Sequence, residues 1–203
     1  MTNMPPAYQP ADDLKIADSI FRTKIEGLLY LEHKRFADER GFFSDITGLK
    51  NIEPIIGRRP EVKQINLAYS HTNVVRGLHA EGWNKLTTVM FGKGMSALVD
   101  IRPDSPSFKQ VEYFFFDPQP TDQLQIGLYV PMGVANSIAV IEGPLLYHYA
   151  VDAFYDERDK TGDKALSLFD PELNIQWPIE RDQMIISDRD RDSATLKELL
   201  AMR

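Results

Sequence analysis

Cysteine is missing from this chain of 203 residues. Its absence excludes disulfide bonds, a thiolate nucleophile, and any zinc or iron–sulfur centre held by cysteine. Long apolar runs are missing too, because no window approaches the roughly 18 to 20 apolar residues that a membrane span needs. With 43% hydrophobic and 26% charged residues, the chain has the composition of a soluble globular protein with one sizeable core. We expect no membrane association and a reducing, cytoplasmic location.

An excess of positive charge is also missing. The chain has 23 Lys and Arg residues against 30 Asp and Glu residues, which makes the net charge -7 at pH 7. This balance argues against nucleic acid or an anionic membrane as the main partner. Any site for phosphate groups must therefore be local.

The N-terminal residues differ from the rest of the chain. Met1–Pro10 is polar and rich in proline, without the apolar core of a signal peptide, and we expect a frayed leader. Asp12–Phe21 is expected to form a short amphipathic helix, with Leu14, Ile16 and Ile20 on one side. The sequence thus predicts a leader with a short helix over residues 1–22 and a single domain over residues 23–203.

Short runs rich in Val, Ile, Tyr and Phe follow, separated by turn residues. Many short strands without helices between them favour an all-β fold, an antiparallel sandwich, jelly roll or small barrel, over a parallel α/β sheet. Ser193–Met202 carries leucines at helical spacing after a possible Ser193 cap and predicts a C-terminal helix. The predicted strands are Ile25–Leu31, Val62–Tyr69, Val74–Leu78, Leu86–Phe91, Met95–Ile101, Val111–Phe116, Leu124–Val130, Ile138–Ile141 and Leu145–Val151.

One segment is suited to proton transfer. Arg76–His79 is followed six residues later by Lys85, so an imidazole that can take a proton lies near an ammonium that can hold negative charge. A lone histidine in a β-rich chain is more often a packed or surface residue, so the interpretation depends on the neighbouring segments.

Two other segments add to it. Residues 35–43 interleave Arg and Phe, which suits pairing with phosphate oxygens and stacking on a flat base. The alternative is a solvated charged turn beside two core phenylalanines. In a strand over residues 145–151, Tyr147 and Tyr149 share one face while His148 takes the other, so a phenol could project toward His79. Strand tyrosines are most often structural, so this pattern alone is weak.

Together these segments resemble the dTDP-4-dehydrorhamnose 3,5-epimerase family, cupin-fold enzymes that act on nucleotide-linked 4-keto-6-deoxy sugars. The resemblance runs from about Phe36 to about Asp190 and rests on the order and spacing of many short pieces. They are Asp38–Phe43, Gln64 with Asn66, Arg76–His79, Lys85 with Leu86, Val99–Arg102, Ser105–Phe108, Val130 with Pro131 and Gly133, Asp170 with Pro171, Ile175, Trp177 with Pro178, and Ile186–Asp190.

The resemblance implies a cupin-type jelly roll and a role for each matching residue. His79 is similar to the family's general base, and Asp190 to the carboxylate that orients it. Lys85 matches the cation near the substrate's carbonyl oxygen. Tyr149 resembles the phenol that returns a proton from the opposite face, and the ungapped spacing from Pro131 favours it over Tyr147. The implied substrate-binding residues are Arg40, Arg76, Gln64, Asn66, Asp45, Phe36, Phe43, Asn136 and Tyr155.

The proposed chemistry requires such a set of groups. A proton on the carbon next to a ketone is weakly acidic, so its removal needs a base that titrates near neutral pH and a charge that stabilises the enolate oxygen. Inversion also requires the proton to return on the other face, which is why a second acid belongs across the cavity.

Asn136 stands where the family pattern has a histidine. An amide donates and accepts hydrogen bonds but does not titrate near neutral pH. The exact sugar, the nucleotide, and inversion at C3, C5 or both therefore stay open, with a mono-epimerase on another sugar as an alternative.

Metal-binding cupins present a further alternative. They supply a His-x-His pair, a Glu and a later His, whereas His79 here is followed by Ala80 and Glu81. We therefore expect no metal and no cofactor. A non-catalytic sugar-nucleotide binder on the same fold is the other rival. The resemblance also implies a homodimer in which an N-terminal strand crosses to the neighbour, and a role in polysaccharide or deoxysugar biosynthesis.

Overall fold

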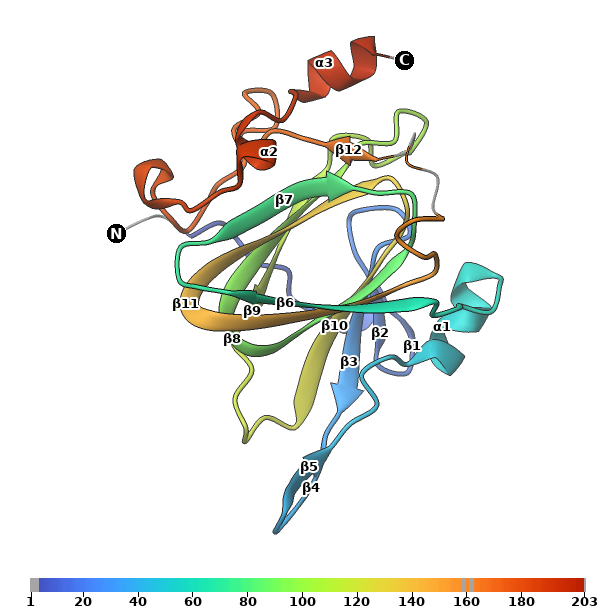
Figure 1. Ribbon diagram of the computed structural model, residues 1–203. Coiled ribbons are helices and arrows are strands. Elements are labelled where there is room, and N and C mark those ends of the chain that lie inside the picture. The colour runs from blue at the N-terminus through green and yellow to red at the C-terminus, as the bar shows by residue number, and fades with distance from the viewer. Residues whose placement is uncertain (1–3, 158–159, 161–162, 203) are drawn as a thin grey trace.

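Long antiparallel strands make up most of the molecule in a computed structural model, which describes residues 4–157, 160 and 163–202 (Figure 1). The main sheet has the order β1-β2-β3-β10-β8-β11-β7-β12, with β6 paired to β11 and β9 to β8. The all-β, antiparallel prediction is confirmed. The strands are β1 (Lys15–Ala17), β2 (Ile20–Arg22), β3 (Leu29–Lys34), β4 (Phe36–Asp38), β5 (Gly41–Phe43), β6 (Gln64–Ser70), β7 (Val75–Ala80), β8 (Lys85–Asp100), β9 (Val111–Phe116), β10 (Leu124–Val130), β11 (Val134–Val151) and β12 (Lys164–Ala165).

Two long, bent strands form the centre of the sheet. The sequence predicts two strands in each of the regions that β8 and β11 occupy, but each region is one continuous strand. Gly92 allows the bend in β8 because its φ is +86° and a Cβ there would lie 2.4 Å from the Pro144 carbonyl oxygen. The long strands β8 and β11 are strongly curved (Figure 1), and residues of both line the pocket described below.

The core lies between the curved faces of the sheet. Its largest cluster joins the β8, β10 and β11 side chains to β3 and β9, with Leu98, Phe114, Leu128 and Leu145 at most 2% exposed. At roughly 25 cal/mol per Å² of buried apolar surface, each such side chain contributes about 1.5 to 3 kcal/mol. This packing holds the strands that carry the pocket residues in a fixed register.

The helix predicted over Asp12–Phe21 is wrong. Only Asp12–Leu14 makes a short 3-10 turn, and β1 and β2 follow it. The adjacent residues Ile20 and Phe21 are both buried, and β2 pairs with β3. Tertiary pairing therefore overrides the helical spacing. The leader is not frayed where it is described, because the Tyr8 backbone N–H donates to the Tyr113 carbonyl at 2.7 Å.

The helices are few and short: α1 (Leu49–Ile56), α2 (Asp188–Arg191) and α3 (Leu196–Ala201), with 3-10 turns at Asp12–Leu14 and Arg181–Gln183. The C-terminal helix is confirmed, but it begins after Thr195 rather than Ser193. Thr195 and Glu198 form a reciprocal capping box, which satisfies the first free backbone N–H groups of α3. The sequence prediction missed α1, α2 and the β4-β5 hairpin.

The segments that flank the sheet differ in how closely they pack. The β4-β5 hairpin extends away from the body of the molecule, whereas α2 and α3 lie along the edge formed by β7 and β12 (Figure 1). No helix in the described part of the chain is long and apolar enough to cross a membrane.

Candidate active site

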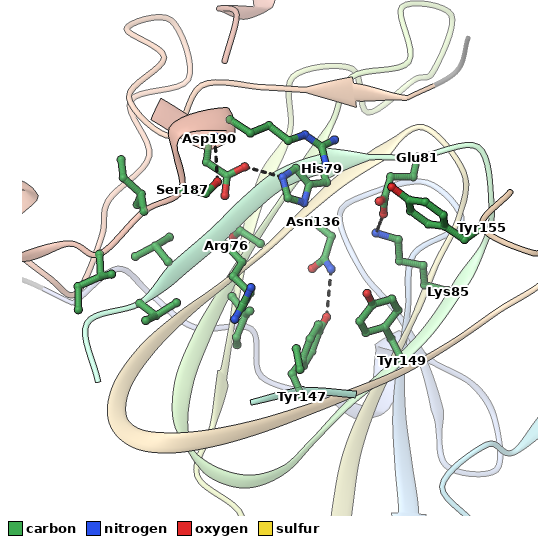
Figure 2. Close-up of a pocket in the computed structure, with 18 residues that line it drawn as sticks. Arg76, His79, Glu81, Lys85, Asn136, Tyr147, Tyr149, Tyr155, Ser187 and Asp190 are labelled. Atoms are coloured by element: carbon green, nitrogen blue, oxygen red, sulfur yellow. Dashed lines mark hydrogen bonds and ion pairs between the residues drawn. The ribbon is translucent and has the colours of Figure 1, made fainter. Parts of the chain in front are cut away.

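A pocket of about 580 Å³ opens between β7, β8, β11 and the segment that leads into α2 (Figure 2). Its wall includes seven of the site residues that the sequence predicts. They are Arg76, His79, Lys85, Asn136, Tyr149, Tyr155 and Asp190, and Tyr147 borders the same cavity. The fold thus brings together residues that lie up to 114 positions apart in the chain, from 76 to 190.

His79 points from β7 toward Asp190 (Figure 2). The imidazole Nε2 lies 2.7 Å from Asp190 Oδ1, and the His79 side chain is 22% exposed. A carboxylate at one ring nitrogen fixes the orientation of the imidazole and stabilises its protonated form. The other nitrogen is thereby left to act on a ligand in the pocket.

Asp190 is held in place by its local backbone. It lies in α2, where the Ser187 hydroxyl caps the helix by accepting from the Asp190 backbone N–H at 3.2 Å. Burial raises the pKa of Asp190, but its hydrogen bond and charge interaction with His79, with further bonds from Gly77 and Ser187, hold that pKa below its usual value. The carboxylate therefore stays ionised beside the imidazole.

Gly77 lets β7 approach β11 closely. Its φ is +115°, and a Cβ there would lie 2.6 Å from the Asn136 carbonyl oxygen. Its N–H points at Asp190 Oδ2 at 3.4 Å. The glycine before Leu78 therefore positions His79 and Asp190 together.

Asn136 and Tyr147 are joined by a hydrogen bond at the floor of the pocket (Figure 2). The Asn136 amide donates to the Tyr147 hydroxyl at 3.0 Å, and both residues are buried. Burial raises the pKa of Tyr147 to about 12, so this phenol stays neutral. Tyr149 shares the same face of β11, with its ring centroid 5.8 Å from that of Tyr147 and more of its side chain open to the cavity.

Lys85 is at the start of β8, where its ammonium meets a carboxylate. Nζ lies 2.5 Å from Glu81 Oε2, and the two side chains are 7% and 13% exposed. On the other side of the cavity, Arg76 Nε donates to the Ser70 hydroxyl at 2.9 Å. The pocket thus holds fixed cationic groups next to the His79 imidazole.

Some predicted substrate-binding residues lie away from the pocket of the same chain. Phe36, Phe43 and Arg40 belong to the β4-β5 hairpin, where the two rings are 65% and 72% exposed and Arg40 pairs with Asp38. Asp45 accepts from the Thr47 hydroxyl at 2.7 Å and stabilises a turn before α1. None of these residues borders the described cavity.

Gln64 and Asn66 lie beside the pocket without bordering it. Gln64 Oε1 accepts from the Tyr155 backbone N–H at 2.9 Å, and its amide donates to Asn66 at 2.6 Å. Asn66 is opposite Tyr149 in the β6-β11 ladder. These two amides therefore contact the strand and loop that carry Tyr149 and Tyr155, but they do not themselves form part of the cavity surface.

Glu81, Ser187 and Arg189 are among the lining residues that were not assigned a role from the sequence. Glu81 lies four residues before Lys85. This spacing of a carboxylate and an ammonium is the sequence feature that could have identified Glu81 as a partner of Lys85. Nothing in the local sequence places Arg189 near Arg76. Within the described residues, no three His, Asp or Glu side chains are grouped as metal ligands.

Comparisons with known proteins identify a family for this chain. Residues 22–198 match the family model described as dTDP-4-dehydrorhamnose 3,5-epimerase. The enzyme of that name from Escherichia coli K12 is 30% identical over 189 residues, which are 91% of this chain and 98% of that protein.

Solved structures show the same fold. A Legionella pneumophila 3,5-epimerase in complex with dTDP-4-keto-L-rhamnose has a TM-score of 0.78 and 28% identity, over 90% of this chain and 95% of that one. ChmJ, a 3'-monoepimerase from Streptomyces bikiniensis in complex with dTDP-quinovose, has a TM-score of 0.76 and 26% identity, over 88% and 89%. The fold is therefore the cupin-type fold of these enzymes, as the resemblance implied. The chain belongs to the dTDP-4-dehydrorhamnose 3,5-epimerase family.

Proposed function

We propose that this protein epimerises a nucleotide-linked 4-keto-6-deoxy sugar at the carbons next to the ketone. The observation that carries the proposal is the His79–Asp190 pair, 2.7 Å apart, at a pocket that also presents Lys85 and Tyr149. The relatives that bind dTDP-sugars support the substrate class.

The first step is removal of the proton next to the ketone by His79. Asp190 stabilises the imidazolium that forms, since its carboxylate remains ionised. The electrons move onto the C4 oxygen, and the Lys85 ammonium stabilises this enolate. Positioned acid–base catalysis contributes about 10²–10⁴-fold to such a step.

The second step returns a proton on the other face. Tyr149 is suited to this role because it projects from β11 toward the cavity, with His79 on the far side (Figure 2). Tyr147 is less suited, because it is buried and its oxygen accepts a hydrogen bond from Asn136. We therefore assign the second acid to Tyr149.

Arg76, Asn136 and Tyr155 are the binding residues that border the cavity in the same chain. The Arg76 guanidinium suits a diphosphate, and the Tyr155 ring, which is 57% exposed, suits a base. Gln64 and Asn66 support this side of the site.

A homodimer would give the remaining predicted residues a function. The β4-β5 hairpin presents Phe36, Phe43 and Arg40 to solvent and extends away from the body of the molecule (Figure 1). The outward face of β6 is apolar, with Ile65, Leu67 and Tyr69 each at least 58% exposed. We infer that two copies pair through these surfaces and that the hairpin residues serve the partner's site.

Inversion at one carbon only is the second candidate. The relatives include both a 3,5-epimerase and a 3'-monoepimerase, and Asn136 departs from the family pattern beside the base. Incubation with a dTDP-4-keto-6-deoxyhexose in D₂O, followed by NMR of C3 and C5, separates the two. Deuterium at both carbons supports the 3,5-epimerase and deuterium at one supports the mono-epimerase. If neither carbon is labelled with any such sugar, the protein is a binder and the proposal fails.

A further inference from the structure

Glu81 and Lys85 form a buried ion pair in the wall of the pocket (Figure 2). The carboxylate Oε2 lies 2.5 Å from the ammonium, and the Trp83 indole N–H donates to the same oxygen at 3.2 Å. A charge-assisted hydrogen bond this short restricts the position of the Lys85 ammonium.

The turn that carries Glu81 is anchored along its length. The Gly82 N–H donates to Asp163 at 3.2 Å, and the Asn84 backbone N–H donates to Asp152 at 2.8 Å. The Asn84 side chain adds a bond to Asp152 at 2.6 Å. Because the backbone is held at both residues, the Glu81 carboxylate is presented to Lys85 at a fixed place.

Charged and titratable groups face Glu81 from several elements. Lys85 comes from β8, His79 from β7, Asp163 from the segment before β12, and Tyr147 from β11. Burial raises the pKa of Glu81, but the charges of Lys85 and His79 and the hydrogen bond from Lys85 hold it below its usual value. The pair therefore consists of two ions.

Stability alone does not account for such a pair. Desolvation of two ions offsets much of their attraction, and apolar replacements of buried pairs are often neutral or stabilising. Glu81 also brings negative charge into a pocket that, on the proposed function, admits a diphosphate. Both points favour a role in the reaction.

We propose that Glu81 is a positioning residue that holds the Lys85 ammonium toward the ketone oxygen of the sugar and away from the diphosphate. This role rests on the proposed epimerase function. Without Glu81, the ammonium is free to move to the stronger negative charge of the phosphates. With it, the carboxylate repels the diphosphate, which then binds at the guanidinium groups of Arg76 and Arg189.

Glu81→Gln tests the role because it removes the charge and keeps the shape of the side chain. The matched control is Glu172→Gln, since Glu172 pairs with Lys109 at the same 2.5 Å on the surface. The readouts are turnover by deuterium exchange, and the affinity for dTDP alone by calorimetry.

We expect Glu81→Gln to lower kcat by about 10- to 100-fold, as a misplaced catalytic group does, while dTDP binds as tightly as before or more tightly. Glu172→Gln should match the wild type in each measurement.

Two outcomes overturn the role of Glu81. One is wild-type turnover in Glu81→Gln. The other is equal loss of turnover and dTDP affinity with a lowered melting temperature, which marks a structural pair. An inactive wild-type enzyme overturns the proposed function itself, so the two failures are distinguishable.

Discussion

Asn136 lies directly opposite His79 in the β7-β11 ladder. Cross-strand neighbours have side chains on the same face, so the amide is a lateral neighbour of the proposed base. The Asn136 amide is directed to the Tyr147 hydroxyl at 3.0 Å. The family pattern has a histidine at this position, which would place a second titratable imidazole beside that of His79. Asn136 is neutral instead.

Asn136→His restores the residue type of the family pattern. We expect the pH profile of deuterium exchange to gain an ionisation, because a histidine titrates at about pH 6.5 and lies next to the base. The amide bond to Tyr147 is lost at the same time. Asn136→Gln, which adds no titrating group, serves as the control, and identical profiles for both variants would contradict the expectation.

His79→Ala should abolish exchange at both carbons and leave the fold intact. The side chain is 22% exposed and faces a cavity, so its removal opens no closed core void. The measurement pairs the exchange assay with circular dichroism and thermal melting. A variant that fails to fold would identify His79 as a packing residue instead.

Tyr149→Phe should impair turnover more than the wash-out of the first proton, because abstraction by His79 precedes the step that needs the phenol. Tyr147→Phe is the matched comparison on the same strand face, and it removes the hydroxyl that accepts from Asn136. We expect a smaller effect there. If Tyr147→Phe shows the selective loss and Tyr149→Phe does not, the second acid is Tyr147.

His33 makes the stability of the fold depend on pH. It is buried in β3, and burial lowers its pKa from 6.5 to about 4, although the Asp45 charge acts in the opposite direction. Between these values the unfolded chain binds a proton that the folded chain does not. The free energy of unfolding therefore falls as pH decreases from about 6.5 to about 4, by roughly 3 kcal/mol in total.

Urea unfolding at a series of pH values measures this dependence. His33→Gln should remove most of the slope in that window, whatever its effect on stability near neutral pH. His71→Gln alters an exposed histidine and should leave the slope unchanged. A slope that persists in His33→Gln would assign the acid sensitivity to other groups.

Much of the fold could be predicted from local patterns. The strands β9 and β10 match their predicted bounds, because both are rich in β-branched, aromatic and other apolar residues and lie between turn residues. The N-terminal helix could not be excluded, since the spacing of Leu14, Ile16 and Ile20 suits a helix until β3 offers a strand to pair with. The sequence of one segment taken alone does not show which distant strand it will pair with.

The candidate site was predictable only in part. His79, Asp190, Lys85 and Tyr149 were found because their segments match a family pattern, and the structure brings all four to one cavity. The hairpin residues Phe36 and Arg40 were expected at the site too, but their distance from it depends on how the hairpin projects. The residues of the hairpin do not by themselves determine the direction in which it projects.

The sequence by itself determined the residue types and their alternation. These were enough for the fold class, the absence of cysteine chemistry and the resemblance to a family of sugar-nucleotide epimerases. Only the tertiary structure decided which groups meet: the imidazole with Asp190, Asn136 with Tyr147, and Lys85 with Glu81. The physical reason is that these contacts depend on strand register and on the packing of distant segments, and no short stretch of chain encodes either.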